Sequence, residues 1–92
     1  MAKRKYPKDN EIMYINDSGF ICNYSSEMIN TDKKIEKILD GKMMIYPQNK
    51  NTSYEFIVDN DAILKNLSIN KKVREDYGLI IFGPVIIRKK RG

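Results

Sequence analysis

The sequence contains no histidine and no tryptophan, and it has a single cysteine, Cys22, among 92 residues. The missing histidine removes the commonest general base and the commonest zinc ligand of proteins. One cysteine excludes a disulfide within the chain and any cluster of zinc-binding thiolates within it. Apolar runs stay well short of the roughly 20 residues that a membrane-spanning helix needs. These absences argue against a zinc enzyme, a disulfide-stabilised scaffold and a helical membrane protein.

The start of the chain bears on where the protein acts, and its amino-acid composition bears on the kind of genome that encodes it. Residues 1–8 carry charge but no apolar stretch follows them, so we expect no secretory signal. Together with the single cysteine, this predicts a reducing compartment, the cytoplasm of a host cell. Ile, Lys and Asn supply 36 of the 92 residues, whereas Ala occurs only twice. Since these three residues use A/T-rich codons, the composition indicates a low-GC bacterium, its phage or a large DNA virus.

Positive charge is concentrated at the two ends of the chain. The bases of residues 1–8 are Lys3, Arg4, Lys5 and Lys8, and those of residues 88–92 are Arg88, Lys89, Lys90 and Arg91. Neither end contains an acid, whereas residues 9–87 hold 9 basic and 12 acidic side chains. The net charge of +5 therefore combines two strongly basic ends with a segment of net charge −3. Because a chain this short seldom holds two cores, we expect a basic arm (1–8), one α+β domain (9–87) and a basic tail (88–92).

Alternating and β-branched residues predict a series of strands. Two of them, residues 11–15 and 20–24, flank a polar turn with a glycine and predict a hairpin. Further strands are expected at residues 42–46 and 53–58. Residues 79–87 form the most apolar stretch, in which Gly83-Pro84 is expected either to bend one long strand or to join two short ones. An apolar character on both faces is typical of a central strand.

One amphipathic helix is predicted between these strands. Thr31 is a suitable N-cap, Ile35, Ile38 and Leu39 lie on one helical face, and Asp40-Gly41 is expected to end the helix. Met28 fits the same face if the helix begins earlier. A polar loop over residues 68–77 has room for one helical turn. The order of elements predicts an α+β fold with one main helix packed on a four- to five-stranded, mostly antiparallel sheet.

Five short motifs occur in a recognisable order. They are residues 35–41 (IEKILDG), 44–47 (MIYP), 56–61 (FIVDND), 64–70 (LKNLSIN) and 80–87 (IIFGPVII). Their order and spacing resemble a family of small phage, plasmid and large-DNA-virus proteins that carry only a domain-of-unknown-function label. The resemblance covers roughly residues 11–88 and leaves most of both basic ends outside it. It implies an accessory protein of a mobile element, and it does not imply a particular activity because none is assigned to the family.

Groups suited to catalysis are scarce. Asp59 and Asp61 flank Asn60 and suit either a divalent cation or the hydrogen bonds of a turn, and the turn is favoured. Cys22 lies among apolar residues of a predicted strand, which favours a small buried residue over a nucleophile that no histidine can activate. The sequence has no glycine-rich phosphate loop. We therefore expect a protein that is not an enzyme and holds no metal or cofactor.

The basic residues favour an anionic partner instead. Dense positive charge attracts nucleic acid from a distance and releases its counterions on binding. Inside the domain, residues 70–74 with Tyr77 form the most basic patch, although Glu75 and Asp76 follow directly. Aromatic side chains suit a stacking platform for bases, but their alternation with aliphatic residues favours packing within the sheet.

These observations predict a non-enzymatic accessory protein of a virus or mobile element that binds nucleic acid through its basic ends. The residues expected to contact this partner are Lys3, Arg4, Lys5, Lys8, Lys71, Lys72, Arg74, Tyr77, Arg88, Lys89, Lys90 and Arg91. An alternative is an anti-defence protein that sequesters a nucleotide signal through the residues of the internal patch. Another is an inhibitor that contacts a host protein through a sheet edge or the Met43-Met44 strand. Self-association of the chain is also left open.

Overall fold

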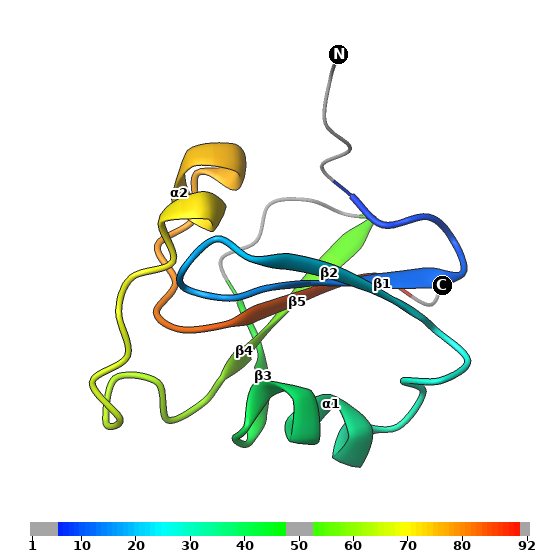
Figure 1. The fold of residues 1–92 in the computed structure, drawn as a ribbon, viewed down its shortest axis with the longest axis horizontal. Coiled ribbons are helices and arrows are strands. Elements are labelled where there is room, and N and C mark those ends of the chain that lie inside the picture. Colours follow the sequence, from blue (N-terminus) through cyan, green and yellow to red (C-terminus); the bar gives the residue numbers. More distant parts are fainter. Residues whose placement is uncertain (1–5, 48–52, 91–92) are drawn as a thin grey trace.

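The computed structural model describes residues 6–47 and 53–90 of the chain. Its elements are β1 (Glu11–Ile15), β2 (Ile21–Ser25), α1 (Asp32–Leu39), β3 (Met43–Ile45), β4 (Tyr54–Asp59), α2 (Lys71–Tyr77) and β5 (Val85–Lys89). The strands form one five-stranded antiparallel sheet in the order β2-β1-β5-β4-β3 (Figure 1). This sheet with its two helices confirms the predicted α+β class.

The sheet has a helix on each face (Figure 1). On one face α1 contributes Ile35 and Leu39 to a core cluster that also contains Ile86 of β5. On the other face α2 contributes Val73 to a cluster that contains Ile87. Successive strand residues point to opposite faces, which is why Ile86 and Ile87 belong to different clusters. The single sheet therefore supports two separate core layers.

The position of β5 confirms the prediction of a central strand. It pairs with β1 on one side and β4 on the other, and Val85, Ile86 and Ile87 are fully buried. Both predicted arrangements, one bent strand and two short strands, are wrong for the residues before Gly83, which contribute only an isolated bridge at Phe82. Gly83 has a φ of 80° and Pro84 follows it, so the strand begins at Val85. The strand also continues through Lys89, so the predicted boundary of the basic tail at residue 88 falls inside the sheet.

The ends of α1 show how its sequence sets its length. The Thr31 side chain accepts a hydrogen bond from the Lys34 N–H at 3.3 Å, which confirms the predicted N-cap. The helix ends where predicted, but the left-handed residue is Asp40, with a φ of 59°, rather than Gly41. A Cβ atom at Gly41 would lie 2.6 Å from the Asp59 Oδ2 atom. Gly41 is therefore required by a close approach to β4.

Met28 does not share the buried face of α1. Its side chain is 67% exposed, and its N–H donates to the Ser25 C=O in a turn that follows β2. The helix begins only after Thr31, so the earlier start that would have placed Met28 on this face does not occur. A turn between residues 25 and 30 leaves no helical face for this side chain to join.

Asn70 places α2 against the rest of the molecule. Its Oδ1 atom accepts a hydrogen bond from the Val73 N–H at 3.1 Å and so caps the helix. Its Nδ2 atom donates to the C=O groups of Ile15 at 3.2 Å and Gly83 at 3.0 Å. The side chain is fully buried and joins β1, α2 and the segment before β5. The structure thus has a second helix of seven residues where the sequence indicated one turn.

Candidate functional site

The N-terminal segment is held against the domain by an aromatic cluster. The ring of Tyr6 stacks on Tyr54 with 4.4 Å between centroids, and it meets the edge of Tyr77 at 5.5 Å. Pro7, which follows, is buried. Residues 6 and 7 therefore belong to the folded unit, so the predicted boundary between arm and domain at residue 8 is wrong. Lys8 is exposed, and Lys3, Arg4 and Lys5 lie outside the described residues.

The C-terminal bases do not form a separate tail. The Arg88 Nε atom lies 3.3 Å from the Glu55 Oε1 atom, within the pairing of β5 with β4. The Lys89 Nζ atom lies 2.8 Å from the Asp9 Oδ1 atom, and this hydrogen bond raises the pKa of Lys89. Both bases were predicted to contact an anionic partner, but acids of the same chain already neutralise them. Arg91 lies outside the described residues.

Both ends of the described chain reach the same end of the sheet. The Lys90 N–H donates to the Ser53 C=O at 2.9 Å, and Ser53 directly precedes Tyr54, on which Tyr6 stacks. Residue 6 is the attachment point of residues 1–5, and residue 90 is that of residues 91–92. Residues 48–52 are joined to the sheet at Ser53. Three covalent attachment points therefore gather where β4 begins.

The net charge of the chain comes from the residues outside the described ranges. The described residues carry 12 basic and all 12 acidic side chains, so their formal charges cancel. The five remaining bases account for the whole net charge of +5, and they are Lys3, Arg4, Lys5, Lys50 and Arg91. Lys50 was not among the predicted binding residues, because its sequence neighbours in residues 48–52 are uncharged and polar. Lys50 is grouped with the terminal bases because residues 48–52 join the sheet at Ser53, beside the attachment points of both chain ends.

The internal basic patch is balanced by acids. The Lys72 Nζ atom lies 2.9 Å from the Asp76 Oδ2 atom, one helical turn away on α2. Lys71 and Lys72 line a shallow hollow of about 490 Å³ together with Asp17 and Glu75. Arg74 is exposed on the same helix. This patch therefore offers less positive potential than its sequence suggested.

The ring of Tyr77 is already in contact with other aromatic side chains of the domain. Its ring meets Phe56 edge-on at 5.2 Å and also contacts Tyr6, within the core cluster that contains Val73. Burial, and then the charge of Asp76, raise the pKa of its hydroxyl. The helical periodicity of α2 turns this ring against the core, and the predicted contact of Tyr77 with a ligand stays a prediction.

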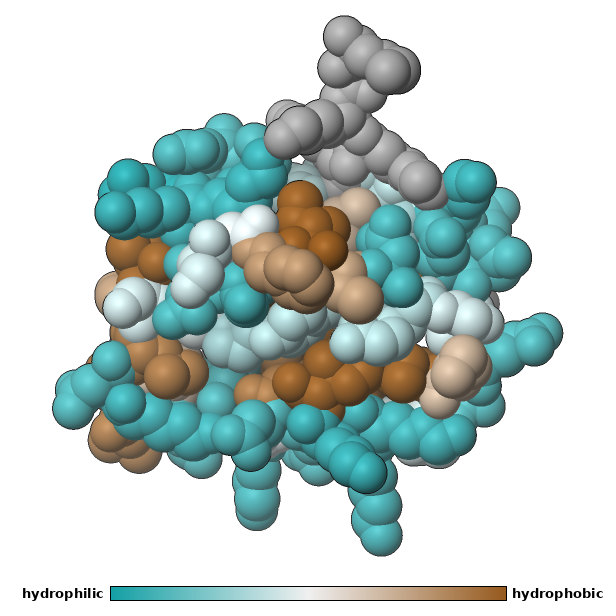
Figure 2. Space-filling model, viewed as in Figure 1, coloured by the Kyte–Doolittle hydropathy of each residue, from teal (hydrophilic) through white to brown (hydrophobic). Residues whose placement is uncertain are grey.

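The aromatic side chains do not form a common platform. Phe56 is fully buried, Tyr14 and Tyr24 pack beside the α1 cluster, and Phe20 is 61% exposed on the far edge of the sheet. On the face shown in Figure 2, hydrophobic side chains form separate patches between hydrophilic ones. Packing within the fold, the favoured interpretation, accounts for most of the rings.

The acidic turn after β4 is a structural feature. The Asp59 Oδ1 atom accepts from the Asp61 N–H at 2.9 Å, and its Oδ2 atom lies 2.7 Å from the Lys65 Nζ atom. Lys65 also donates to the Asp40 C=O at 2.6 Å and so ties this turn to the end of α1. In the part of the chain that the structure describes, no three His, Cys, Asp or Glu side chains are placed to hold a metal ion. The turn interpretation of the sequence therefore agrees with the contacts, and Lys65 is a partner that the sequence did not reveal.

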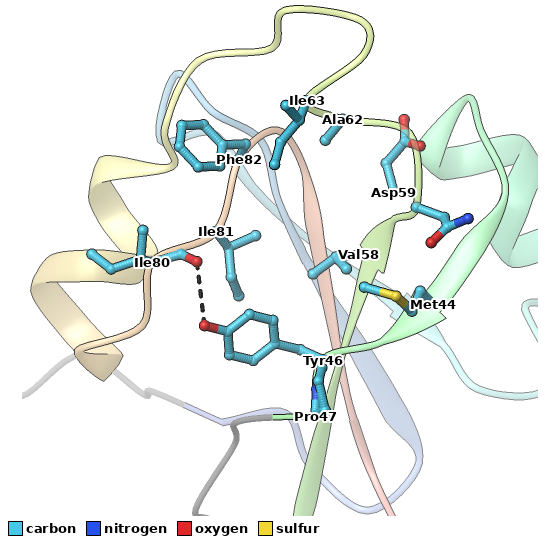
Figure 3. A pocket seen from close by; sticks show the side chains of 11 residues that line it. Met44, Tyr46, Pro47, Val58, Asp59, Ala62, Ile63, Ile80, Ile81 and Phe82 are labelled. Carbon is cyan, nitrogen blue, oxygen red and sulfur yellow. Dashed lines mark hydrogen bonds between the residues drawn. The ribbon is translucent and has the colours of Figure 1, made fainter.

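An apolar pocket of about 320 Å³ was not predicted. Figure 3 shows its walls, formed by β3, β4, the turn after β4 and the segment that leads to β5. The Tyr46 hydroxyl donates to the Ile80 C=O at 3.3 Å across one side (Figure 3). Ile63 and Ile80 are 73% and 53% exposed beside it. Exposed apolar residues of three separate segments meet here, and a scan along the sequence gives no sign of their proximity.

Two remaining predictions concern membranes and Cys22. Cys22 is half-buried on the outer strand β2, so it is less enclosed than the sequence indicated. Within residues 6–47 and 53–90, neither helix has the length and apolar character needed to cross a membrane.

Comparisons of the chain with protein-family models, curated proteins and solved structures give no match.

Proposed function

We propose that the protein binds nucleic acid, without catalysing a reaction, through basic segments attached to one end of its sheet. The role fits an accessory protein of a virus or mobile element, which is also what the family resemblance implies. The observation that carries the proposal is the meeting of Tyr6, Ser53 and Lys90 where β4 begins. All charge that the described residues do not balance is attached at these points.

The body and the basic segments have different parts in this proposal. Acids of the same chain neutralise Lys72, Arg88 and Lys89, so the folded body supplies little attraction for phosphate. Lys3, Arg4, Lys5 and Arg91 supply the affinity, because each phosphate contact releases condensed counterions. The body brings two chain ends to one place and raises the local density of positive charge. Binding of this kind reads the phosphate backbone and has little preference for base sequence.

A binding titration with matched variants tests the proposal. Replacing Lys3, Arg4, Lys5 and Arg91 by glutamine should abolish most of the affinity for a duplex oligonucleotide at low salt. The control variant replaces three exposed bases of α1, namely Lys33, Lys34 and Lys37, and should bind nearly as well as the parent chain. Adding Lys50→Gln to the first variant should weaken binding further. Equal losses in the two variants would contradict the proposed location.

Amide shifts in an NMR titration give a second readout. We expect the largest changes among described residues at Tyr6, Ser53 and Lys90, next to the attachment points. Changes centred on α1 would contradict the proposal. The comparison of single-stranded with double-stranded DNA and RNA in the same titration identifies the preferred partner.

The alternative functions predict a different outcome. A protein that sequesters a nucleotide signal should bind a cyclic dinucleotide or an ADP-ribose derivative at high salt, even after the terminal bases are removed. An inhibitor of a host protein should form a 1:1 complex that is equally insensitive to salt. Either result, with no binding of oligonucleotides, would replace the present proposal.

A further inference from the structure

The two edges of the sheet differ in how their backbone groups are used. β3 forms one edge and is three residues long. Its pairing with β4 directs the backbone groups of Met43 and Ile45 outward, and the next outward position is Pro47. The Met43 N–H already donates to the Glu36 Oε2 atom at 2.9 Å, and Pro47 has no N–H. This edge is therefore guarded against pairing with another strand.

The other edge, β2, has open backbone groups. The Asn16 N–H donates to the Phe20 C=O and the Ser26 N–H to the Asn10 C=O, which fixes the ladder with β1. Hydrogen-bonded pairs alternate along an antiparallel ladder, so the backbone N–H and C=O groups of Cys22 also point toward β1. The N–H groups of Ile21, Asn23 and Ser25 consequently point away from the sheet, and all three residues are exposed.

The sequence of β2 contains none of the usual protections of an edge strand. Its five residues, ICNYS, include no charged side chain and no proline. Its register with β1 is continuous over all five residues, so no bulge interrupts it. Only the Ser25 C=O is in use, since it accepts the N–H groups of Met28 and Ile29. Ile21 and Asn23 each keep a donor and an acceptor directed outward.

We propose that two copies of the chain pair through β2, antiparallel, with the two-fold axis at Cys22. In this register the Ile21 N–H of each copy donates to the Asn23 C=O of the other, and the Asn23 N–H donates to the Ile21 C=O. Both residues of the pair have donor and acceptor open, so the arrangement is self-complementary. The two sheets become one continuous sheet of twice the width.

The side chains favour this register over its neighbours. It places Phe20, which is 61% exposed, opposite Tyr24 of the second copy on both sides of the axis. An axis at Asn23 would instead direct the Ile21 N–H toward the Ser25 C=O, which already accepts two hydrogen bonds. The axis at Cys22 also sets the two Cys22 residues opposite each other in a non-hydrogen-bonded pair. Their Cα atoms would be about 4.5 Å apart, within the range of a disulfide.

Sedimentation over a range of concentrations tests the pairing with two matched variants. Asn23→Pro removes an outward N–H of β2 without touching the ladder to β1, and should abolish the dimer. Ile45→Pro removes the outward N–H of the guarded edge, and should leave the dimer intact. Circular dichroism confirms that each variant is folded. Because Asn23→Pro is able to disturb the strand, Phe20→Ala is the second test, and should weaken dimerisation about five- to thirty-fold through two lost aromatic pairs.

Oxidation with diamide reports the register, since each disulfide transfers two hydrogens from two Cys22 thiols to the oxidant. Parent protein should give a covalent dimer far faster than Asn23→Pro or Phe20→Ala. Added salt should strengthen the dimer, because each copy carries +5, whereas it should weaken binding to nucleic acid. A parent protein that stays monomeric at the near-millimolar concentrations of NMR overturns the proposal. Dimers that Asn23→Pro and Phe20→Ala leave unchanged also overturn it.

Discussion

The rings of Tyr6 and Tyr54 are stacked, with 4.4 Å between their centroids and an interplanar angle of 23°. This contact joins the N-terminal segment to the first residue of β4, next to the residue that bonds Lys90. Two ends of the chain that are far apart in sequence are thereby brought to one place. The stack consequently packs against the core and lies next to the point where residues 1–5 are attached.

Tyr6→Ala should lower the free energy of unfolding by about 2 kcal/mol, because it removes a stacked pair, an edge contact and buried apolar surface. Urea denaturation measures this change. Tyr6→Phe keeps the ring and is the control, with stability expected close to that of the parent. A Tyr6→Ala protein as stable as the parent would show that the N-terminal segment is not anchored by this ring.

Asn70→Ala should be among the most damaging polar substitutions, with a loss of about 2–4 kcal/mol. It removes the cap of α2 and leaves the buried C=O groups of Ile15 and Gly83 without the Asn70 donor. Thr31→Ala removes only an exposed cap from α1 and should cost about 1 kcal/mol. Thermal or urea unfolding of both variants checks the order, and an equal loss would contradict the structural role of Asn70.

Lys65 should make stability depend on alkaline pH. Its hydrogen bond to Asp59 raises the pKa of Lys65 above its usual value of 10.5. A pKa raised by folding means that this contribution is complete below the ordinary value and is lost as pH rises through the raised one. The melting temperature of the parent should therefore fall more steeply above about pH 10 than that of Lys65→Met. Parallel curves would contradict a stabilising pair.

Lys65→Met should also destabilise the protein at neutral pH. The Asp59 carboxyl group is only 1% exposed, and without Lys65 it remains buried with no ion-pair partner. Lys42→Met, a change at an exposed lysine before β3, is the control and should leave stability nearly unchanged. Melting temperatures at pH 7 provide the measurement.

The strands and α1 were predictable from sequence because their signals are local. The Thr31 side chain caps α1 by accepting a hydrogen bond from the Lys34 N–H, three residues further along the chain. The alternation of residues in β4 directs Phe56 and Val58 to one face of the sheet. The apolar run that ends in Ile86 and Ile87 indicated a central strand, since both faces of that strand are covered. α2 was underestimated because Val73 is its only residue with less than a tenth of its surface exposed, and its cap, Asn70, resembles any loop asparagine.

The predicted binding site depended on contacts that sequence cannot show. Lys89 and Asp9 are 80 positions apart, yet their side chains form an ion pair. The position of Tyr77 in a basic segment suggested an exposed ring, whereas α2 turns it toward Phe56. Binding of nucleic acid by the basic ends stays a prediction. What the structure adds is the place where they are attached.

The salt dependence of oligonucleotide binding is the measurement that tests the central claim most directly. The logarithm of the association constant for a duplex should fall steeply with the logarithm of salt concentration for the parent chain. Replacing Lys3, Arg4, Lys5 and Arg91 by glutamine should flatten that slope by about 3 to 4 units, whereas replacing Lys33, Lys34 and Lys37 should leave it unchanged. Equal slopes for the parent chain and the terminal variant would contradict binding through the chain ends.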